Sequence, residues 1–203
     1  MFALLVLVAV AVQARSLADL AIFNPVNYLS FFTIQSNLIA AALLILGVAR
    51  WRAGPSSRVD LLRGGAVVYM LVTGTVYFLL LRNVEVDTAI PWVNSVVHQV
   101  MPIVIIADWL IDPPATRLTV TQGLLWRSYP AVWILYTLIR GPFAHWYPYP
   151  FLNPANGGYV TVALYSATIL LLMLAVCAAV AAIGNALSRR SRTASAIGPG
   201  PAA

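Results

Sequence analysis

The sequence predicts an all-α fold, a polytopic membrane helix bundle with about six transmembrane helices, and three observations support this. Of its 203 residues, 61% are hydrophobic and 9% are charged, whereas a soluble domain carries roughly 25% charged residues. The apolar residues gather in runs, and a helix needs about 20 such residues to cross a bilayer. Short polar stretches that contain proline or glycine separate the runs.

Six apolar runs give the expected helices in chain order. The first run is short, so it fits a full helix, a truncated one or the apolar part of a signal peptide, although it lacks a basic leader. The runs cover Phe2–Ala14, Phe31–Val48, Gly65–Leu81, Trp92–Ile111, Leu124–Ile139 and Tyr159–Ile183. We therefore expect a single transmembrane helical domain over residues 1–187 and a disordered cytoplasmic tail over residues 188–203.

The arginines predict how the helices are oriented. Basic residues outnumber acidic ones by 12 to 6, and basic residues beside apolar spans favour the cytoplasmic side. If the amino terminus is cytoplasmic, nine arginines fall inside (Arg50, Arg52, Arg58, Arg63, Arg117, Arg127, Arg189, Arg190 and Arg192) and three outside (Arg15, Arg82 and Arg140). The sequence thus predicts a protein of the cytoplasmic membrane with a cytoplasmic carboxyl terminus. Membrane orientation accounts for the positive charge, which therefore gives no support to nucleic-acid binding.

Cofactor and metal chemistry has little support in the sequence. Cys177 is the only cysteine and lies in an apolar run, so it offers neither an internal disulfide nor a thiolate cluster. The histidines are His98 and His145, too few for a zinc site of three or four ligands. No glycine-rich phosphate loop is present. We expect no metal and no organic cofactor.

Two ionisable side chains fall inside the fourth apolar run, where a charge is costly and suggests a function. Asp108 is expected to form a structural ion pair with Arg127, which enters the fifth run from the same side. The alternatives are a role for Asp108 in proton movement or catalysis, and an Arg127 that extends to the lipid headgroups. His98 lies roughly 15 Å from Asp108 along the helix, too far for a hydrogen bond.

His98 has neighbours that suit a polar cavity. Asn94 precedes it by one helical turn and can hold the imidazole in one tautomer. Pro102 has no N–H for the carbonyl of residue 98, which favours a bend there. Thr33 and Asn37 belong to a polar stripe on the second helix at a similar depth. The alternative is a structural role, in which these side chains only form hydrogen bonds with one another or with their own helices.

A threonine beside a histidine has a chemical use. An unassisted hydroxyl is a weak nucleophile, so His98 would have to accept the Thr33 proton during attack on a carbonyl. Asn37 is the candidate donor to the resulting oxyanion. Arg140 begins an aromatic and proline-rich outer segment and could bind an anionic headgroup or a fatty carboxylate. The alternative for that segment is an aromatic belt at the membrane interface.

Three segments carry a family resemblance: Phe31-Phe32-Thr33, the Trp92, Asn94, His98 and Pro102 array, and Tyr149-Pro150-Phe151-Leu152. Over residues 17–185 the chain resembles the androgen-induced protein and androgen-dependent TFPI-regulating protein family, in particular its bacterial integral-membrane branch. The resemblance implies hydrolysis of fatty acid esters of hydroxy fatty acids, with Thr33 as nucleophile and His98 as its partner. The chain departs from the animal members in its shorter length and at Ser95 and Val97.

The sequence therefore favours an intramembrane threonine hydrolase that cleaves a lipid ester, with membrane lipids or the lipid ester as its partners. The main alternative is a non-catalytic multi-pass protein that binds a lipid or small amphiphile. A proton-coupled carrier that uses His98 and Asp108 is a third interpretation. It needs a polar path between them, and the sequence from Gln99 to Ala107 is almost wholly apolar.

Overall fold

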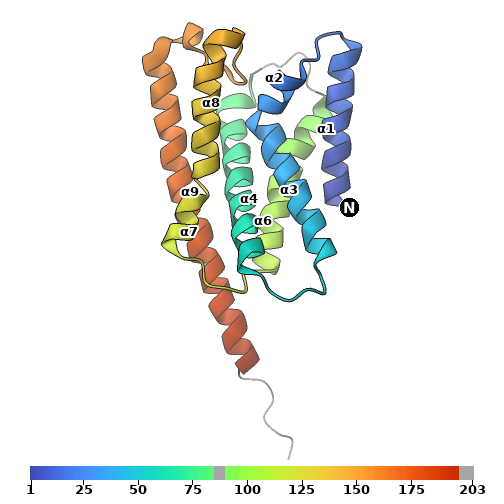
Figure 1. Ribbon diagram of the computed structural model, residues 1–203, viewed down its shortest axis with the longest axis vertical. Helices are drawn as coiled ribbons and strands as arrows, with labels where there is room; N and C mark the ends of the chain where they lie inside the picture. The colour runs from blue at the N-terminus through green and yellow to red at the C-terminus, as the bar shows by residue number, and fades with distance from the viewer. Residues whose placement is uncertain (85–89, 197–203) are drawn as a thin grey trace, which may run out of the picture.

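The fold is an all-α helical bundle, as the sequence predicts (Figure 1). A computed structural model describes residues 1–84 and 90–196, and this part of the chain contains helices and no strand. The elements are α1 (Phe2–Asp19), α2 (Pro25–Ser30), α3 (Phe32–Ala49), α4 (Ser57–Val76), the π turn η1 (Tyr77–Leu81), α5 (Pro91–Ser95), the π turn η2 (Val96–Val100), α6 (Met101–Ile111), α7 (Val120–Leu125), α8 (Ser128–Ala144), the 3-10 turns η3 (Pro150–Leu152) and η4 (Pro154–Asn156), and α9 (Gly158–Ala196).

Five described helical segments are long and apolar enough to cross a membrane, which identifies a membrane protein. They are Phe2–Asp19, Phe32–Ala49, Ser57–Leu81, Pro91–Ile111 and Gly158–Arg189. The expected fifth helix is instead divided into α7 and α8, and α8 has 17 residues. A local feature favours the division here: Pro130 has no N–H for the carbonyl of Trp126, the C-cap residue of α7.

Helix α4 lies at the centre of the bundle and contacts α3, α6 and α9 (Figure 1). Four of its side chains, Ala66, Val67, Val68 and Met70, are at most 3% exposed. Gly64 on the same helix lets the indole of Trp126 approach, since a Cβ there would lie 2.3 Å from Trp126 Cζ2. The indole nitrogen donates to the carbonyl of Leu61 at 2.7 Å, which fixes the ring in place.

The carboxyl-terminal prediction is wrong in part, because α9 continues to Ala196 and residues 188–196 are helical. The helix is held beyond its apolar run by the segment that precedes α7. Asn185 exchanges two hydrogen bonds with the backbone of Leu118, at 2.8 and 2.9 Å, and the Ser188 hydroxyl donates to the carbonyl of Pro114. The rest of the expected tail, residues 197–203, lies outside the described residues.

Candidate functional site

The structure brings Thr33 and His98 together. Thr33 is the second residue of α3, and His98 lies in η2 on a different helix. Thr33 Oγ1 is 3.3 Å from His98 Nε2. This is slightly longer than the roughly 2.6–3.2 Å of an engaged nucleophile and base, a difference that is common in ligand-free sites.

The imidazole of His98 is held in the tautomer that a base requires. Its Nδ1 lies 3.1 Å from the backbone carbonyl of Asn94, which can only accept a hydrogen bond, so Nδ1 carries the proton and Nε2 faces Thr33 with a lone pair. Asn94 therefore does fix the tautomer of His98, but through its backbone carbonyl and not through its side chain. The side-chain amide instead donates to Tyr77 Oη at 2.6 Å.

Two π turns build this part of the site. Tyr77 opens η1 and His98 lies within η2, and their rings stack with centroids 4.1 Å apart and an angle of 16°. In η2 the N–H of Met101 bonds to the carbonyl of Val96, five residues back. The next residue is Pro102, which has no N–H, so the π register leaves the Val97 carbonyl without a helical partner. The prediction from the sequence named the carbonyl of His98 instead, because in an α-helix the residue at position 102 would bond to the carbonyl of residue 98.

Asn37 supplies the missing hydrogen bond. Its Nδ2 donates to the carbonyl of Val97 at 3.0 Å and to that of Thr33 at 2.8 Å, and the side chain is fully buried. Both amide hydrogens are therefore occupied, so the expectation that Asn37 stabilises an oxyanion is not supported. Asn37 instead ties α3 to η2 and positions Thr33 opposite His98.

Tyr149, which reasoning from the individual residues missed, completes the cluster. The backbone N–H of Thr33 donates to Tyr149 Oη at 3.1 Å, and the two side-chain oxygens also lie 3.1 Å apart. Burial raises the pKa of the Tyr149 phenol, which therefore keeps its proton and can donate to Thr33 Oγ1. The only signal in the sequence was its place in the Tyr149-Pro150-Phe151-Leu152 segment.

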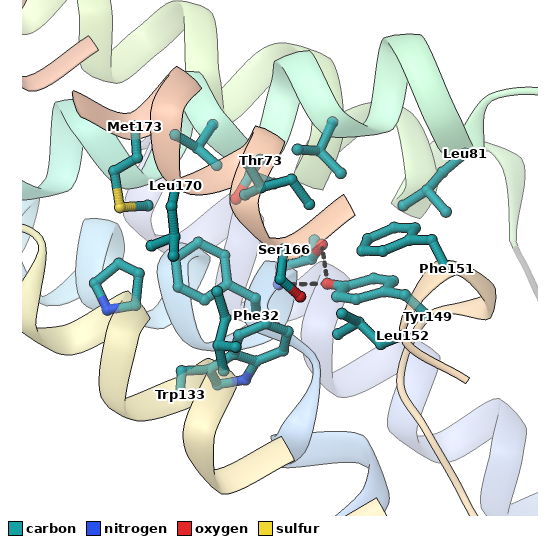
Figure 2. A pocket seen from close by; sticks show the side chains of 16 residues that line it. Phe32, Thr73, Leu81, Trp133, Tyr149, Phe151, Leu152, Ser166, Leu170 and Met173 are labelled. Atoms are coloured by element: carbon teal, nitrogen blue, oxygen red, sulfur yellow. Dashed lines mark hydrogen bonds between the residues drawn. The ribbon is translucent and has the colours of Figure 1, made fainter. Parts of the chain in front are cut away.

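An apolar cavity begins at Thr33 and Tyr149 and runs between α4, α8 and α9 (Figure 2). The space that can hold the centre of a water-sized molecule is about 50 Å³, so the cavity is narrow. Ser166 also lines it, and among the described residues its buried hydroxyl has no hydrogen-bond partner. Leu170 forms part of the wall and is 37% exposed, so the cavity reaches the apolar surface of α9.

No family model, curated protein or solved structure matches this chain. The resemblance seen in the sequence therefore remains a prediction. The chemistry has to be argued from the site itself, since a helix bundle alone does not indicate an activity.

Arg140 lies apart from the cavity. Its guanidinium donates to Asn27 Oδ1 at 2.6 Å and lies 5.6 Å from the ring centroid of Trp146. The guanidinium of Arg140 therefore links α2, through Asn27, to the loop after α8, through Trp146. Arg140 is not among the residues that line the cavity, so it has no direct contact with a ligand there.

The predicted Asp108–Arg127 ion pair is wrong. Asp108 Oδ2 lies 2.9 Å from Nη2 of Arg63, which projects from α4, the helix packed against α6. Arg63 also contacts Asp112 at 3.0 Å and Asp60 at 3.9 Å. Arg127 instead donates to the carbonyl of Leu124 at 3.4 Å, because it belongs to the turn between α7 and α8.

Proposed function

We propose that this protein is an intramembrane lipid-ester hydrolase, with Thr33 as nucleophile and His98 as general base. The observation that carries the proposal is the 3.3 Å approach of Thr33 Oγ1 to the lone-pair nitrogen of an imidazole whose other nitrogen is anchored on a backbone carbonyl. A hydroxyl needs such a base to become a useful nucleophile. The family resemblance points to the same two residues.

The reaction uses groups that the site already holds. Thr33 Oγ1 attacks the ester carbonyl carbon while its proton passes to His98 Nε2. The tetrahedral intermediate then collapses, the bond to the alcohol breaks, and the departing oxygen takes the proton from His98. Water repeats the sequence on the acyl-threonine, which releases the carboxylic acid and restores both side chains.

Tyr149 and Ser166 are the proposed donors to the carbonyl oxygen as it gains negative charge. Tyr149 Oη already accepts from the Thr33 N–H, so its own proton can turn from Thr33 Oγ1 to a bound carbonyl. The Ser166 hydroxyl lines the same cavity and has no partner among the described residues. Fixed donors at a developing oxyanion are often the largest single contribution to catalysis.

The cavity supports an acyl chain as the recognised part of the substrate. None of its lining residues is charged. Its wall on α9 extends from Ser166 to Met173, about 10 Å along the axis at 1.5 Å per residue. Each buried methylene stabilises binding by about 0.8 kcal/mol, so chain length would dominate affinity. The exposed Leu170 at the wall gives a chain access from the bilayer.

A second candidate function is non-catalytic binding of a lipid or small amphiphile. It is favoured by the hydrogen bonds between Thr33 and Tyr149, which satisfy both hydroxyls without any substrate. In that case the cluster is a polar element of the core beside a lipid cavity. Covalent chemistry at Thr33 distinguishes the two functions.

The test is labelling of the purified protein by a lipophilic fluorophosphonate, with the adduct mapped by mass spectrometry. The proposal expects an adduct on Thr33 that is lost in Thr33→Ala and strongly reduced in His98→Ala. Matched controls are Thr168→Ala, an exposed threonine whose hydroxyl bonds to its own helix, and His145→Asn in the loop after α8. An adduct that is absent, or unchanged in His98→Ala, would favour the lipid-binding function.

A further inference from the structure

A second cavity lies beside α7, along the stretch of α9 that directly follows the one lining the cavity at Thr33. Its walls come from the segment before α7, from α7 itself and from α9. The space open to the centre of a water-sized molecule is about 570 Å³, against about 50 Å³ in the cavity at Thr33. The lining includes Arg117 and Arg127 and, on α9, Leu174, Ala178 and Ala182.

Two arginines in this lining have no acidic partner. Arg63 takes up Asp60, Asp108 and Asp112, and within the described part of the chain no carboxylate pairs with Arg117 or Arg127. Arg127 is half-buried, and its one side-chain bond is the 3.4 Å contact with the Leu124 carbonyl. A half-buried arginine beside an apolar groove is favourable when an anion pairs with it.

The remaining wall is apolar and faces outward. Leu174 is 39% exposed, and Ala178 and Ala182 are exposed alanines on the same stretch of α9. Small side chains there leave a groove along the helix, and the two arginines flank α7, with Arg117 before it and Arg127 after it. Two cations beside an apolar groove match an anionic phospholipid, with its phosphate at the arginines and its chains along α9.

We propose that this cavity binds one anionic phospholipid, with the phosphate held between Arg117 and Arg127 and the acyl chains against Leu174, Ala178 and Ala182. Basic pockets between helices bind anionic headgroups in this way, at about 1 kcal/mol per arginine, which is about five-fold in the binding constant. The site does not depend on the chemistry at Thr33. The bound lipid would anchor the segment that joins α7 to α8, because its phosphate would supply the anionic partner that Arg127 lacks among the described residues.

The experiment measures lipid retention by native mass spectrometry. The purified full chain is incubated with equal amounts of phosphatidylglycerol and phosphatidylcholine that carry identical chains. Wild type should retain the anionic lipid preferentially, by about 25-fold if both arginines act. In the double variant Arg117→Gln/Arg127→Gln this preference should disappear, and in Ala178→Phe, which fills the groove, retention of both lipids should fall.

The control is Arg58→Gln, an exposed arginine that does not line this cavity. Its lipid preference should equal that of wild type, and gel filtration with circular dichroism checks that each variant is folded. Equal retention of the two lipids by wild type would overturn the proposal, as would an unchanged preference in the double variant or an equal loss in Arg58→Gln. Displacement of the lipid by a large excess of inorganic phosphate would overturn it too, because the site would then recognise the free anion.

Discussion

Replacing Asn37 with leucine should weaken the junction between α3 and η2 more than the loss of one polar side chain usually does. Leucine keeps the approximate volume and removes both N–H donors. The carbonyl of Thr33 retains a second donor, the Ser36 hydroxyl at 3.1 Å. The carbonyl of Val97 does not, because Pro102 cannot bond to it in the π register. One buried acceptor therefore loses its partner.

The magnitude follows from that difference. An ordinary hydrogen bond contributes about 0.5–1.5 kcal/mol, and a buried group left without a partner costs about 1–3 kcal/mol. We expect Asn37→Leu to lower the free energy of unfolding by about 2–3 kcal/mol. In a Pro102→Ala background the new N–H can bond to Val97, so the same substitution should then cost only about 1 kcal/mol. The coupling between the two positions is thus about 1–2 kcal/mol.

The assay is reversible unfolding in mixed micelles, with an increasing fraction of sodium dodecyl sulfate and far-UV circular dichroism as the signal. Wild type, both single variants and the double variant form the cycle. Thr137→Val serves as a control, since it removes a buried hydroxyl that has no partner among the described residues. It should change stability by less than about 0.5 kcal/mol. Additive effects of Asn37→Leu and Pro102→Ala would refute the account of the π register.

Three further predictions concern other parts of the molecule. Arg63→Met should cost about 1–2 kcal/mol in the same unfolding assay, because it leaves the buried Asp60 carboxylate without its cation, while the more exposed Asp108 and Asp112 are screened by solvent. Arg127→Met should cost under about 0.5 kcal/mol; equal losses would contradict the observed ion pairs. Tyr149→Phe should slow fluorophosphonate labelling by at least about 10-fold, since it removes a donor at the oxyanion, and an unchanged rate would exclude that role. Gly64→Ala should cost about 1–3 kcal/mol through a clash with a buried indole, while Gly47→Ala, with open space around it, should be neutral or slightly stabilising; a matching loss in both would point to a backbone effect.

The sequence predicts most of the fold because the length of each apolar run, which marks a helix that can span a membrane, can be seen without knowing how the helices pack. The α3 helix, Phe32–Ala49, differs from the predicted run by one residue at each end. The approach of Thr33 to His98 is also predictable, since both lie at a similar depth on helices that enter from the same side. The predictions that failed are contacts between elements for which depth in the membrane left more than one partner open.

The ion pair of Asp108 illustrates this failure. Depth alone admits either Arg63 or Arg127 as the partner. The choice is made by the packing of α4 against α6, which no pattern within one helix encodes. Tyr149 was missed for the same reason, because it reaches Thr33 from a loop 116 residues further along the chain.

The backbone around His98 and Thr33 fixes the direction of the hydrogen bonds in the site. The Asn94 carbonyl fixes the proton on Nδ1 of His98, so Nε2 must accept from Thr33. The single hydroxyl proton of Thr33 is then used, so Oγ1 can only accept the proton of Tyr149. Every hydrogen bond in the cluster then has one direction, set at both ends by the backbone. Only the Tyr149 proton can be given up to a ligand without breaking this order. A carbonyl that arrives through the cavity would therefore compete for that proton, beside a threonine already directed at its base.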